Sequence, residues 1–337
     1  MTFKVQVRPS GHEFPVQEGE TILDAALHHG YAFPYGCRNG ACGACAARVL
    51  GGEVDYGDNS PMALSDDEIA QGMALCCQAM PASDVVLEVH EIDGAGELEV
   101  KTLPCKLERM ERLADDVMRL YLKLPDSERL QFMAGQYLNF ILEDGRKRAF
   151  SIANAPHDDA FIELHVRHVE GGAFTDHVFN DMREKEILRI EGPLGTFFLR
   201  EDTDRPVILV GGGTGFAPLK GMLEHAFHIG MDKPMHLFWG VRARADLYLD
   251  ELVRGWLGEH PNLRYTPVLS SPGEQDAWDG ATGYVHEAVI RACPDLSGHE
   301  VYMSGPPAMI QAAKDAFLGH GLPVTQLYSD SFDFAGD

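Results

Sequence analysis

The feature that most constrains this chain is a glycine-rich stretch with three closely spaced cysteines, residues 34–45 (PYGCRNGACGAC). Cys37, Cys42 and Cys45 have the spacing C-x4-C-x2-C, in a chain with only 7 cysteines among 337 residues. Thiolates at this spacing bind a 2Fe–2S cluster, provided that a fourth cysteine follows downstream. The interspersed glycines let backbone N–H groups approach such a cluster, because they carry no Cβ. The stretch therefore predicts a loop around an iron–sulfur centre.

The fourth ligand is either Cys76 or Cys77, in the segment ALCCQAMP. Adjacent side chains point in different directions, so only one of the two is expected to reach the metal. A zinc site is the alternative for clustered cysteines, but zinc sites usually pair two C-x2-C knuckles and only Cys42–Cys45 makes one here. The region resembles the plant-type ferredoxin signature, and this resemblance implies that Cys77 is the ligand and that Cys76 packs in the core.

Length and charge restrict the partners of the chain. Its 337 residues predict two or three domains. The net charge of −24 argues against nucleic acid and anionic membranes as partners, and no apolar run approaches the roughly 18–20 residues of a membrane span. Residues 1–93 hold 4 Lys or Arg against 14 Asp or Glu, which indicates either a plainly soluble surface or an acidic docking face for a basic protein. The N-terminus reads as a strand rather than an export signal, so we expect a cytoplasmic protein, where clustered cysteines more often bind metal than form disulfides.

Residues 1–93 read as one domain of short strands and two short helices, which predicts an α+β fold. Thr21 is expected to cap the first helix and Gly30 to end it, while Ser65 begins the second. The ferredoxin resemblance implies the β-grasp form of this fold.

The rest of the chain changes pattern twice. Residues 94–104 contain two glycines and a proline, and are expected to form a linker. Residues 105–203 read as strand after strand, which predicts an antiparallel β-barrel with one helix near residues 173–182. Residues 204–337 alternate strands with helices, which predicts an α/β domain with a doubly wound parallel sheet.

A strand of the predicted barrel carries the motif RAFSIAN, residues 148–154. The motif resembles the Arg-x-Tyr/Phe-Ser flavin signature of the ferredoxin–NADP reductase superfamily. By that resemblance, Arg148 neutralises the FAD diphosphate, Phe150 packs on the isoalloxazine and the Ser151 hydroxyl hydrogen-bonds flavin N5. The chemistry is reasonable, since a guanidinium suits phosphate and a small hydroxyl can sit beside a nitrogen that gains or loses a proton.

The segment EGGAFT supplies a second element, because its glycines lead into an expected helix whose N-terminus can face a pyrophosphate. It matches the second phosphate-contact element of the superfamily; an ordinary turn in a plain barrel is the alternative. His165 and His168 lie three apart on a strand and face opposite sides, which argues against a metal site. The candidate FAD-binding residues are Arg148, Ala149, Phe150, Ser151, His165, Val166, Gly171, Gly172 and Thr175.

The third domain opens with VILVGGGTGFAPLKGML, a glycine-rich turn between a strand and a helix. Such a turn accepts an anion, but Pro218 stands where the dinucleotide fingerprint G-x-G-x-x-G has its last glycine. The form G-x-G-x-x-P is the one that the reductase superfamily uses for the nicotinamide dinucleotide. The resemblance therefore assigns Gly213, Thr214, Gly215 and Pro218 to that ligand.

Two further segments complete the predicted site. VYMSGPPAMI looks like the superfamily's Cys-Gly-Pro-Pro element, with Ser304 in place of the cysteine, so we expect Ser304, Gly305 and Pro306 to position the nicotinamide without cysteine-assisted hydride transfer. The tail YSDSFDFAGD places Phe332 and Phe334 where related reductases set an aromatic against the flavin, and the Asp-x-Phe match favours Phe332. Terminal aromatics are as often plain core. The candidate catalytic residues are Ser151, Ser304 and Phe332.

The order of the three domains resembles the single-chain NADH-dependent reductases of bacterial multicomponent oxygenases, such as those of benzoate dioxygenase and soluble methane monooxygenase. This resemblance implies 2Fe–2S, FAD and NADH as cofactors. It also implies electron transfer to an acceptor protein, a terminal oxygenase or hydroxylase docking at the acidic ferredoxin domain. Arg242 or Arg244 could pair with the extra phosphate of NADPH, but the resemblance favours NADH.

Two alternatives stay open at this point. The CDP-6-deoxy-glucoseen reductase group shares the domain order, and in it the same electron chain serves a nucleotide-sugar dehydratase. The other alternative is a zinc-stabilised binding module fused to a plain flavin reductase, which would contain zinc in place of iron and acid-labile sulfide.

Overall fold

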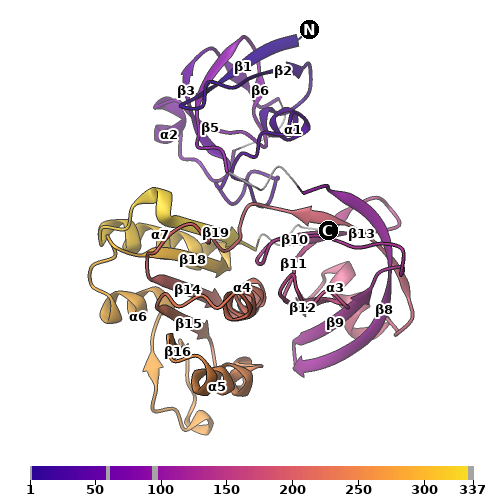
Figure 1. The fold of residues 1–337 in the computed structure, drawn as a ribbon, viewed down its shortest axis with the longest axis vertical. Coiled ribbons are helices and arrows are strands. Elements are labelled where there is room, and N and C mark those ends of the chain that lie inside the picture. The colour runs from indigo at the N-terminus through magenta and orange to yellow at the C-terminus, as the bar shows by residue number, and fades with distance from the viewer. Residues whose placement is uncertain (1, 58–60, 93–97, 333–337) are drawn as a thin grey trace. The chain divides into compact units, whose positions relative to one another are not determined.

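The structure is a computed structural model, and it describes residues 2–57, 61–92 and 98–332 (Figure 1). By its internal contacts the chain divides into two compact units, Met1–Glu99 and Val100–Asp337. This division falls inside the stretch expected to be a linker, residues 94–104.

The first unit is a small sheet with a helix packed across it. Its elements are β1 (Thr2–Arg8), β2 (Glu13–Gln17), α1 (Ile22–His28), β3 (Ala46–Gly51), β4 (Val54–Asp55), α2 (Asp66–Ala70), β5 (Met73–Leu75), β6 (Met80–Pro81) and β7 (Val85–Glu88). Five strands form one sheet in the order β2-β1-β7-β3-β5, in which β1 and β7 are parallel and the other neighbours antiparallel. The apolar face of α1, including Ile22 and Leu23, is buried in one core with Val5 and Leu87 of the sheet. This is the expected α+β arrangement.

Local chemistry sets the two helices of this unit. The Thr21 side chain accepts a hydrogen bond from the Asp24 N–H at 3.1 Å, and Gly30 follows the helix with a φ of +80°. Ser65 and Glu68 form a capping box, in which the Glu68 N–H donates to Ser65 Oγ and the Ser65 N–H donates to the Glu68 carboxylate. Both helix starts agree with the sequence expectation.

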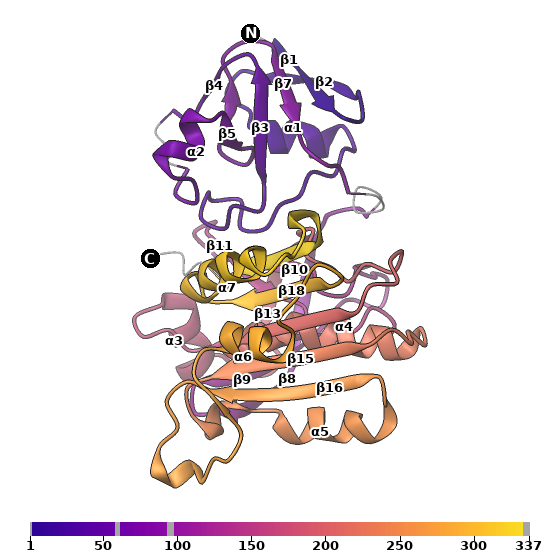
Figure 2. The same ribbon diagram turned by 90° about the vertical axis from the view of Figure 1, so that its left-hand side faces the viewer.

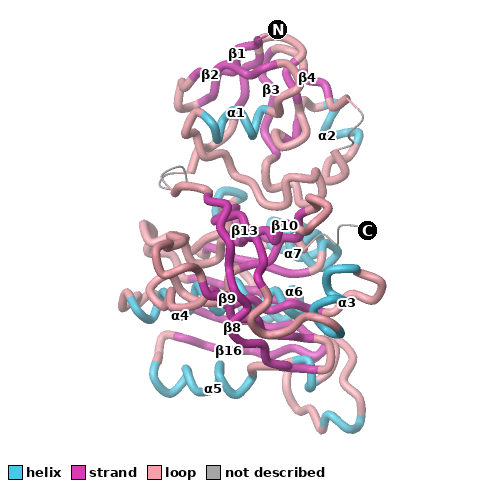
Figure 3. Tube along the Cα trace, turned by 90° about the vertical axis from the view of Figure 1, so that its right-hand side faces the viewer, coloured by secondary structure: helices cyan, strands magenta, loops and turns pink. Residues whose placement is uncertain are grey.

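The second unit begins with an antiparallel barrel. Its elements are β8 (Lys101–Ala114), β9 (Val117–Lys123), β10 (Tyr137–Ile141), β11 (Lys147–Ser151), β12 (Ile162–Arg167), α3 (Ala173–Asn180) and β13 (Ile187–Leu194). The strand order is β11-β10-β13-β8-β9-β12, and every neighbouring pair is antiparallel. Figure 3 labels four of these strands, β8, β9, β10 and β13, in magenta. A bridge between Ile152 and Leu164 joins the continuation of β11 to β12 and so closes the barrel.

The barrel starts earlier than the sequence suggested. Strand β8 begins at Lys101, inside the expected linker, and pairs with β13 over residues 101–106. Along its other edge β8 pairs with β9 only from Lys106 onwards in the described residues, so Pro104 lies where that edge has no partner. A proline is tolerated at such a strand edge because the missing N–H donor is not needed there.

A parallel sheet follows the barrel in the same unit. Its elements are β14 (Val207–Gly212), α4 (Phe216–His228), β15 (Met235–Val241), α5 (Asp250–Glu259), β16 (Leu263–Leu269), β17 (Ala281–Thr282), α6 (Val285–Ala292), β18 (Glu300–Gly305), α7 (Pro307–Gly319) and β19 (Leu327–Ser331). The order β17-β16-β15-β14-β18-β19 is parallel throughout. Helices α4 and α5 pack in one core on one face, and α6 and α7 pack in another core on the opposite face (Figure 2). This doubly wound layout confirms the predicted fold class.

The order of the strands indicates which end of this sheet binds ligands. The chain leaves β14, runs outward through β15 to β17, and then returns to β18 on the other side of β14. Open α/β sheets bind ligands at such a switch point, outside the carboxyl ends of the strands. The glycine turn after β14 and the segment after β18 therefore share one edge.

The segment between β15 and α5 differs from expectation. The pattern ADLYLDELVRGWL predicts a helix from residue 245, but Arg244–Asp246 form a short 3-10 turn and the α-helix begins at Asp250. The Asp246 carboxylate accepts a hydrogen bond from the Ala243 N–H at 2.9 Å, which closes the turn and delays the helix. In the part of the chain that the structure describes, no helix has both the length and the apolarity that a membrane crossing needs.

Candidate functional site

The cysteine loop lies between α1 and β3, and its backbone turns toward its own sulfurs. The Cys42 N–H donates to Cys37 Sγ at 3.3 Å, the Cys37 N–H donates to Cys42 Sγ at 3.4 Å, and the Ala44 N–H donates to Cys42 Sγ at 3.5 Å. Gly40 and Gly43 have φ values of 87° and 73°, a conformation that residues with a Cβ rarely adopt. Backbone donors gathered on sulfur suit thiolates that bind iron.

The four predicted cluster ligands lie in two contacting pairs. Cys37 is hydrogen-bonded to Cys42, and Cys45 to Cys77. Within each pair the bond favours the thiolate of one partner, so the pKa of Cys37 falls to about 6 and the pKa of Cys77 is also lowered, while the pKa values of Cys42 and Cys45 rise. Cys76 is fully buried, and this burial raises its pKa to about 12. The side chain that the structure places with the loop cysteines is that of Cys77.

These thiols fit a 2Fe–2S cluster. Among the described residues, no group of three or more His, Cys, Asp or Glu side chains is arranged around a single metal ion. A 2Fe–2S cluster distributes four thiolates over two irons, and the two contacting pairs supply four thiols. The pairs and the backbone donors of the loop therefore match what such a cluster requires.

The predicted flavin strand, β11, presents side chains of different exposure. Phe150 is half-buried, and its ring packs on Phe140 and Phe174 with centroid distances of 5.8 and 5.5 Å. Arg148 is half-buried and Ala149 is exposed on the same strand. The strand thus holds an aromatic side chain and a guanidinium on a partly open surface.

A tight turn before α3 forms the second predicted phosphate element. The Thr175 hydroxyl donates to the Val169 carbonyl at 3.0 Å, and the Val169 N–H donates to the same hydroxyl at 3.1 Å. Gly171 has a φ of +78°, and Gly172 is the N-cap of α3, where no side chain caps the helix. A helix start left without a side-chain cap offers backbone N–H groups to an anion. Together with Arg148, this turn fits the diphosphate of FAD.

The glycine turn after β14 is packed directly against the end of β18. Gly213–Gly215 form a 3-10 turn that leads into α4, and Thr214 is buried. A Cβ on Gly215 would lie 1.9 Å from the Ser304 carbonyl oxygen, so only glycine allows this approach. Pro218 lies in the first turn of α4, where its missing N–H costs no helical hydrogen bond.

Among the predicted site residues, Ser304 stands out by the hydrogen bonding of its hydroxyl. It is fully buried, and its hydroxyl has no hydrogen-bond partner among the described residues. Buried hydroxyls are normally paired, and a bound carboxamide beside the glycine turn would satisfy this one. Gly305 and Pro306 follow at the same edge of the sheet. The residues present therefore fit a nicotinamide dinucleotide.

Strand β19 brings the three catalytic candidates together. The Ser151 hydroxyl donates to Asp330 Oδ2 at 3.0 Å, and Asp330 is the register partner of Ser304 in the pairing of β18 with β19. The Phe332 N–H donates to the Gly305 carbonyl at 2.9 Å, which places the predicted aromatic at the same edge. Phe334 lies outside the described residues. The role of Asp330 was not predicted, because only the local Asp-x-Phe match points to it.

The side chains of His165 and Val166 are engaged by contacts within the protein. Val166 is fully buried in the barrel core, whereas His165 is hydrogen-bonded to Glu163 and to the Tyr248 hydroxyl. Strand β12 is buried along both faces because the parallel-sheet domain, through Tyr248, covers the side that the barrel core does not. The side chains of the two residues predicted as flavin contacts thus have partners already.

The arginines considered for NADPH differ in their surroundings. The Arg244 N–H donates to Asp276 Oδ1 at 3.2 Å, and its guanidinium donates to the Asp276 carbonyl at 3.3 Å. Both arginines are exposed, and Asp276 holds the Arg244 guanidinium in place.

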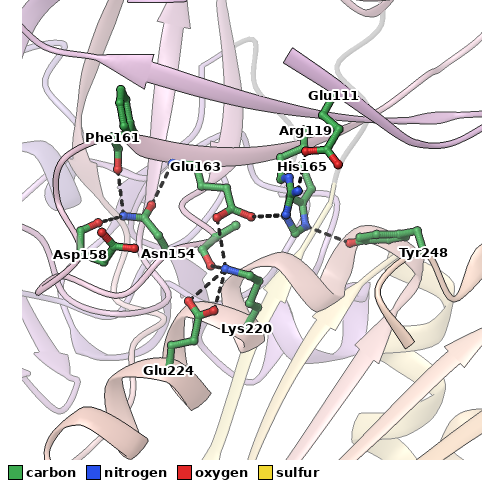
Figure 4. Close-up of polar contacts among 11 residues, drawn as sticks. Glu111, Arg119, Asn154, Asp158, Phe161, Glu163, His165, Lys220, Glu224 and Tyr248 are labelled. Carbon is green, nitrogen blue, oxygen red and sulfur yellow. Dashed lines mark hydrogen bonds and ion pairs between the residues drawn. The ribbon is translucent and has the colours of Figure 1, made fainter. Parts of the chain in front are cut away.

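Sequence reasoning missed a buried ionic network between the barrel and the parallel-sheet domain (Figure 4). Its central contact joins Glu163 of β12 to Lys220 of α4, 57 residues apart, at 3.2 Å. No local pattern connects such distant charges. In the sequence, Lys220 is the one charged residue of the stretch FAPLKGML at the start of the helix.

Three protein-family models match the chain in succession. The 2Fe-2S iron-sulfur cluster binding domain matches residues 5–82, the oxidoreductase FAD-binding domain matches residues 104–199, and the oxidoreductase NAD-binding domain matches residues 209–315. These matches confirm the predicted cofactors, and they favour the iron–sulfur interpretation of the cysteine loop over zinc.

Full-length relatives share all three parts. The CDP-6-deoxy-L-threo-D-glycero-4-hexulose-3-dehydrase reductase of Yersinia pestis is 42% identical over 332 residues, which covers 98% of this chain and 99% of the relative. The phenol hydroxylase P5 protein of Acinetobacter pittii is 36% identical over 343 residues, with coverage of 100% and 96%. Among solved structures, the cytochrome P450 reductase of Amycolatopsis has a TM-score of 0.79 at 35% identity and covers 98% of both chains.

Proposed function

Because this chain belongs to the family of single-chain reductases that join a 2Fe–2S domain, an FAD barrel and an NAD domain, we propose that it passes electrons from NADH to a terminal oxygenase. The chain is an electron-transfer oxidoreductase with these three cofactors. The observation that carries the proposal is the junction of Ser151, Asp330 and Ser304, because it brings the flavin strand and the nicotinamide edge of the sheet to one place.

The cofactors supply the redox chemistry: FAD exchanges two electrons with a nicotinamide and one at a time with a 2Fe–2S cluster. The residues bind and orient them. In this proposal Ser151 hydrogen-bonds the flavin ring and Arg148 neutralises the diphosphate at the start of α3. Ser304, whose hydroxyl has no partner within residues 2–57, 61–92 and 98–332, would orient the nicotinamide, and Phe332 would cover the flavin from the end of β19.

Cluster binding is assigned to the cysteine pairs. Cys37 and Cys42 would hold one iron, and Cys45 and Cys77 the other, because these are the thiols that contact each other. The domain limits that go with these roles are residues 1–93 for the ferredoxin domain, 101–203 for the FAD barrel, which starts with β8, and 204–337 for the nucleotide domain. Clustered cysteines without disulfides are typical of the cytoplasm, where we place the protein.

The acidic first domain supports docking of a basic acceptor. Helix α2 exposes Asp66, Asp67 and Glu68. Its segment is tied to the cysteine loop by a hydrogen bond from the Ala63 N–H to the Gly40 carbonyl at 3.0 Å. Carboxylates beside an electron-donating centre steer a partner of opposite charge, and such steering weakens as salt screens it. We therefore expect electron transfer to the acceptor to slow as ionic strength rises, while reduction of the flavin by NADH changes little.

A nucleotide-sugar dehydratase is the second candidate acceptor. The observation in its favour is the 42% identity to the Yersinia pestis reductase, against 36% to the phenol hydroxylase protein. The two candidates share every step up to the cluster. They are separated by mixing the NADH-reduced protein with a purified oxygenase component or with a purified dehydratase, and by following which one re-oxidises it.

The experiment that tests the proposal is an anaerobic absorbance titration of the purified protein with NADH, and then with NADPH. We expect the flavin and iron–sulfur bands to bleach together with NADH and poorly with NADPH. Bleaching of a flavin band alone, in a protein that shows no iron–sulfur absorbance at the start, would contradict the assignment of the cysteine loop.

A further inference from the structure

The ionic network between the barrel and the parallel sheet is buried at its centre. The side chains of Glu163 and Lys220 are 10% and 5% exposed, and Glu163 Oε2 lies 3.2 Å from Lys220 Nζ (Figure 4). Glu163 Oε1 lies 2.9 Å from the His165 ring and 3.7 Å from Arg119, and Lys220 also lies 2.9 Å from Glu224. Burial opposes ionisation of Glu163, but the hydrogen bond from His165 and the charge of Lys220 outweigh it and lower its pKa to about 2.

Glu163 is fastened to the segment that follows the flavin serine. The Ala153 N–H donates to the Glu163 carbonyl at 2.8 Å, and the Glu163 N–H donates to Asn154 Oδ1 at 2.8 Å. Asn154 is held in turn by the carbonyls of Asp158 and Phe161, at 2.6 and 3.0 Å. The Glu163 carboxylate therefore stands at a fixed place relative to residues 152–154, directly after Ser151.

Lys220 belongs to the helix that follows the glycine turn. Its Nζ donates to the Ala153 carbonyl at 3.3 Å as well as to Glu163, so one ammonium group bridges the barrel segment. The next residue, Gly221, allows α4 to come very close, because a Cβ there would lie 2.9 Å from the Asn154 carbonyl oxygen. Helix α4 starts immediately after Gly213–Gly215. Fixing Lys220 therefore fixes the turn that is assigned to the nicotinamide dinucleotide.

A second arm of the network reaches the same turn from the other side. His165 is hydrogen-bonded to the Tyr248 hydroxyl at 3.1 Å. The Tyr248 ring packs on Trp239 with a centroid distance of 5.1 Å, and Trp239 Nε1 donates to the Gly213 carbonyl at 2.9 Å. From Glu163, one path leads through Lys220 to the helix after the turn, and the other leads through His165 to the first residue of the turn.

Stability alone explains such a pair poorly. Replacing a buried ion pair with apolar residues of similar volume is often neutral or stabilising, whereas removing one partner leaves a costly unpaired charge. A buried pair that contributes little to stability but joins two domains is suited to control of geometry. Hydride transfer depends on geometry strongly, since a misplacement of about 1 Å can lower a rate on the order of 10²-fold.

We propose that Glu163 and Lys220 are positioning residues for hydride transfer: their ion pair sets the glycine turn of the nucleotide domain at a fixed distance from the flavin strand. This inference rests on the proposed function. In this proposal the pair acts through α4 on one side and through residues 152–154 on the other, by the contacts of Lys220 with Ala153 and of Glu163 with Asn154.

The test uses the full-length protein loaded with FAD and cluster. Three variants are compared with wild type: Lys220→Met, Glu163→Gln and the double variant. Stopped-flow measurement at saturating NADH gives the limiting rate of flavin reduction, and NADH deuterated at the transferred position gives its isotope effect. We expect a rate at least tenfold lower in each variant and an isotope effect larger than in wild type, because the hydride step becomes slower relative to binding. We also expect a weaker NAD–flavin charge-transfer band. Reduction of flavin and cluster by dithionite should stay at the wild-type rate, since it needs no nicotinamide.

A second buried pair in the same domain is the matched control. Lys233 Nζ lies 2.6 Å from Glu300 Oε1, with side chains 8% and 0% exposed, but Glu300 begins β18 and so lies at the opposite end of the sheet from the glycine turn. Lys233→Met should lower the thermal midpoint as the network variants do, with the limiting rate and isotope effect unchanged. If a single variant does not retain FAD, the double variant is measured in its place, because it leaves neither Glu163 nor Lys220 charged.

The outcomes separate the inference from the proposed function. A wild-type protein whose flavin NADH does not reduce refutes the proposed function itself. Wild-type rate and isotope effect in the FAD-loaded double variant refute the positioning role and leave the function standing. An equal loss of rate in Lys233→Met also refutes it, because the effect would then follow general destabilisation.

Discussion

The hydroxyl of Ser151 donates a hydrogen bond to the carboxylate of Asp330 across 3.0 Å, although the two residues are 179 positions apart in the chain. This contact joins the flavin strand of the barrel to the last strand of the parallel sheet. It fixes the position of the Ser151 oxygen where the two domains meet, with the serine O–H directed at the Asp330 carboxylate. A group whose position is set by the fold need not be relocated during the reaction.

Replacing Ser151 with alanine should slow NADH-dependent flavin reduction. Loss of a positioned hydroxyl beside a group that exchanges a proton costs roughly 10²-fold in rate. Stopped-flow reduction of the FAD-loaded variant by NADH measures this loss. Ser329→Ala, one position from Asp330 on β19, is the control and should reduce at the wild-type rate. An unchanged rate in Ser151→Ala would remove the residue from the site.

Neighbouring cysteines should respond differently to substitution. Cys77 contacts Cys45, whereas Cys76 is enclosed in the core. Cys77→Ser should therefore lose the iron–sulfur absorbance and its complement of iron and acid-labile sulfide. Cys76→Ala should keep both. The reverse result would make Cys76 the fourth ligand.

Substituting Gly215 should damage the nucleotide site while sparing the flavin. An alanine Cβ there would lie 1.9 Å from the Ser304 carbonyl oxygen, so the turn and the end of β18 must separate. Forced packing of this kind costs about 1–3 kcal/mol. We expect weaker NADH binding, measured by titration, with FAD content unchanged. Gly255→Ala is the matched control: Gly255 is in the interior of α5 with open space around it, and the change should stabilise the domain by about 0.5–1 kcal/mol.

His236 should make the second unit less stable in mild acid. Burial and the nearby charge of Arg264 lower its pKa to about 4, from an ordinary value of 6.5. Between these values only the unfolded chain binds the proton. The contribution of His236 to the free energy of unfolding is therefore complete above pH 6.5, and it is lost as the pH drops toward 4. Denaturant unfolding followed by tryptophan fluorescence at several pH values should show a shallower decline in His236→Gln than in wild type. Parallel curves for the two proteins would contradict this assignment.

Much of the fold follows from local chemistry in the sequence. The caps at Thr21 and Ser65 mark helix starts by side-chain hydrogen bonds to the nearest backbone groups. The cysteine spacing and the glycine turn also carry their chemistry within a few residues. Such features need no knowledge of the rest of the chain, and they led to the family that the comparisons show.

Other features depended on contacts between distant segments. In the sequence, Pro104 indicates a linker. Its place on the unpartnered edge of β8 follows only from the packing of the neighbouring strands. His165 and Val166 lie on a strand that is covered on both sides, and the cover over His165 comes from Tyr248, 83 positions later. Asp330 and Lys220 carry no local signal of their partners. Their roles emerge from sheet register and helix packing, which sequence periodicity does not specify.

The network around Glu163 has a consequence for how such chains can be recombined. The chain separates by its contacts between Glu99 and Val100, whereas the barrel and the nucleotide domain count as one unit. A chimera that takes the first unit from one relative and the remainder from another keeps Glu163 with Lys220, and Ser151 with Asp330. A crossover between β13 and β14 would divide both pairs between parents. Active chimeras among reductases of this family should therefore mostly have their crossover between Glu99 and Val100. A crossover between β13 and β14 should give an active protein only when the two parents carry compatible residues in both pairs.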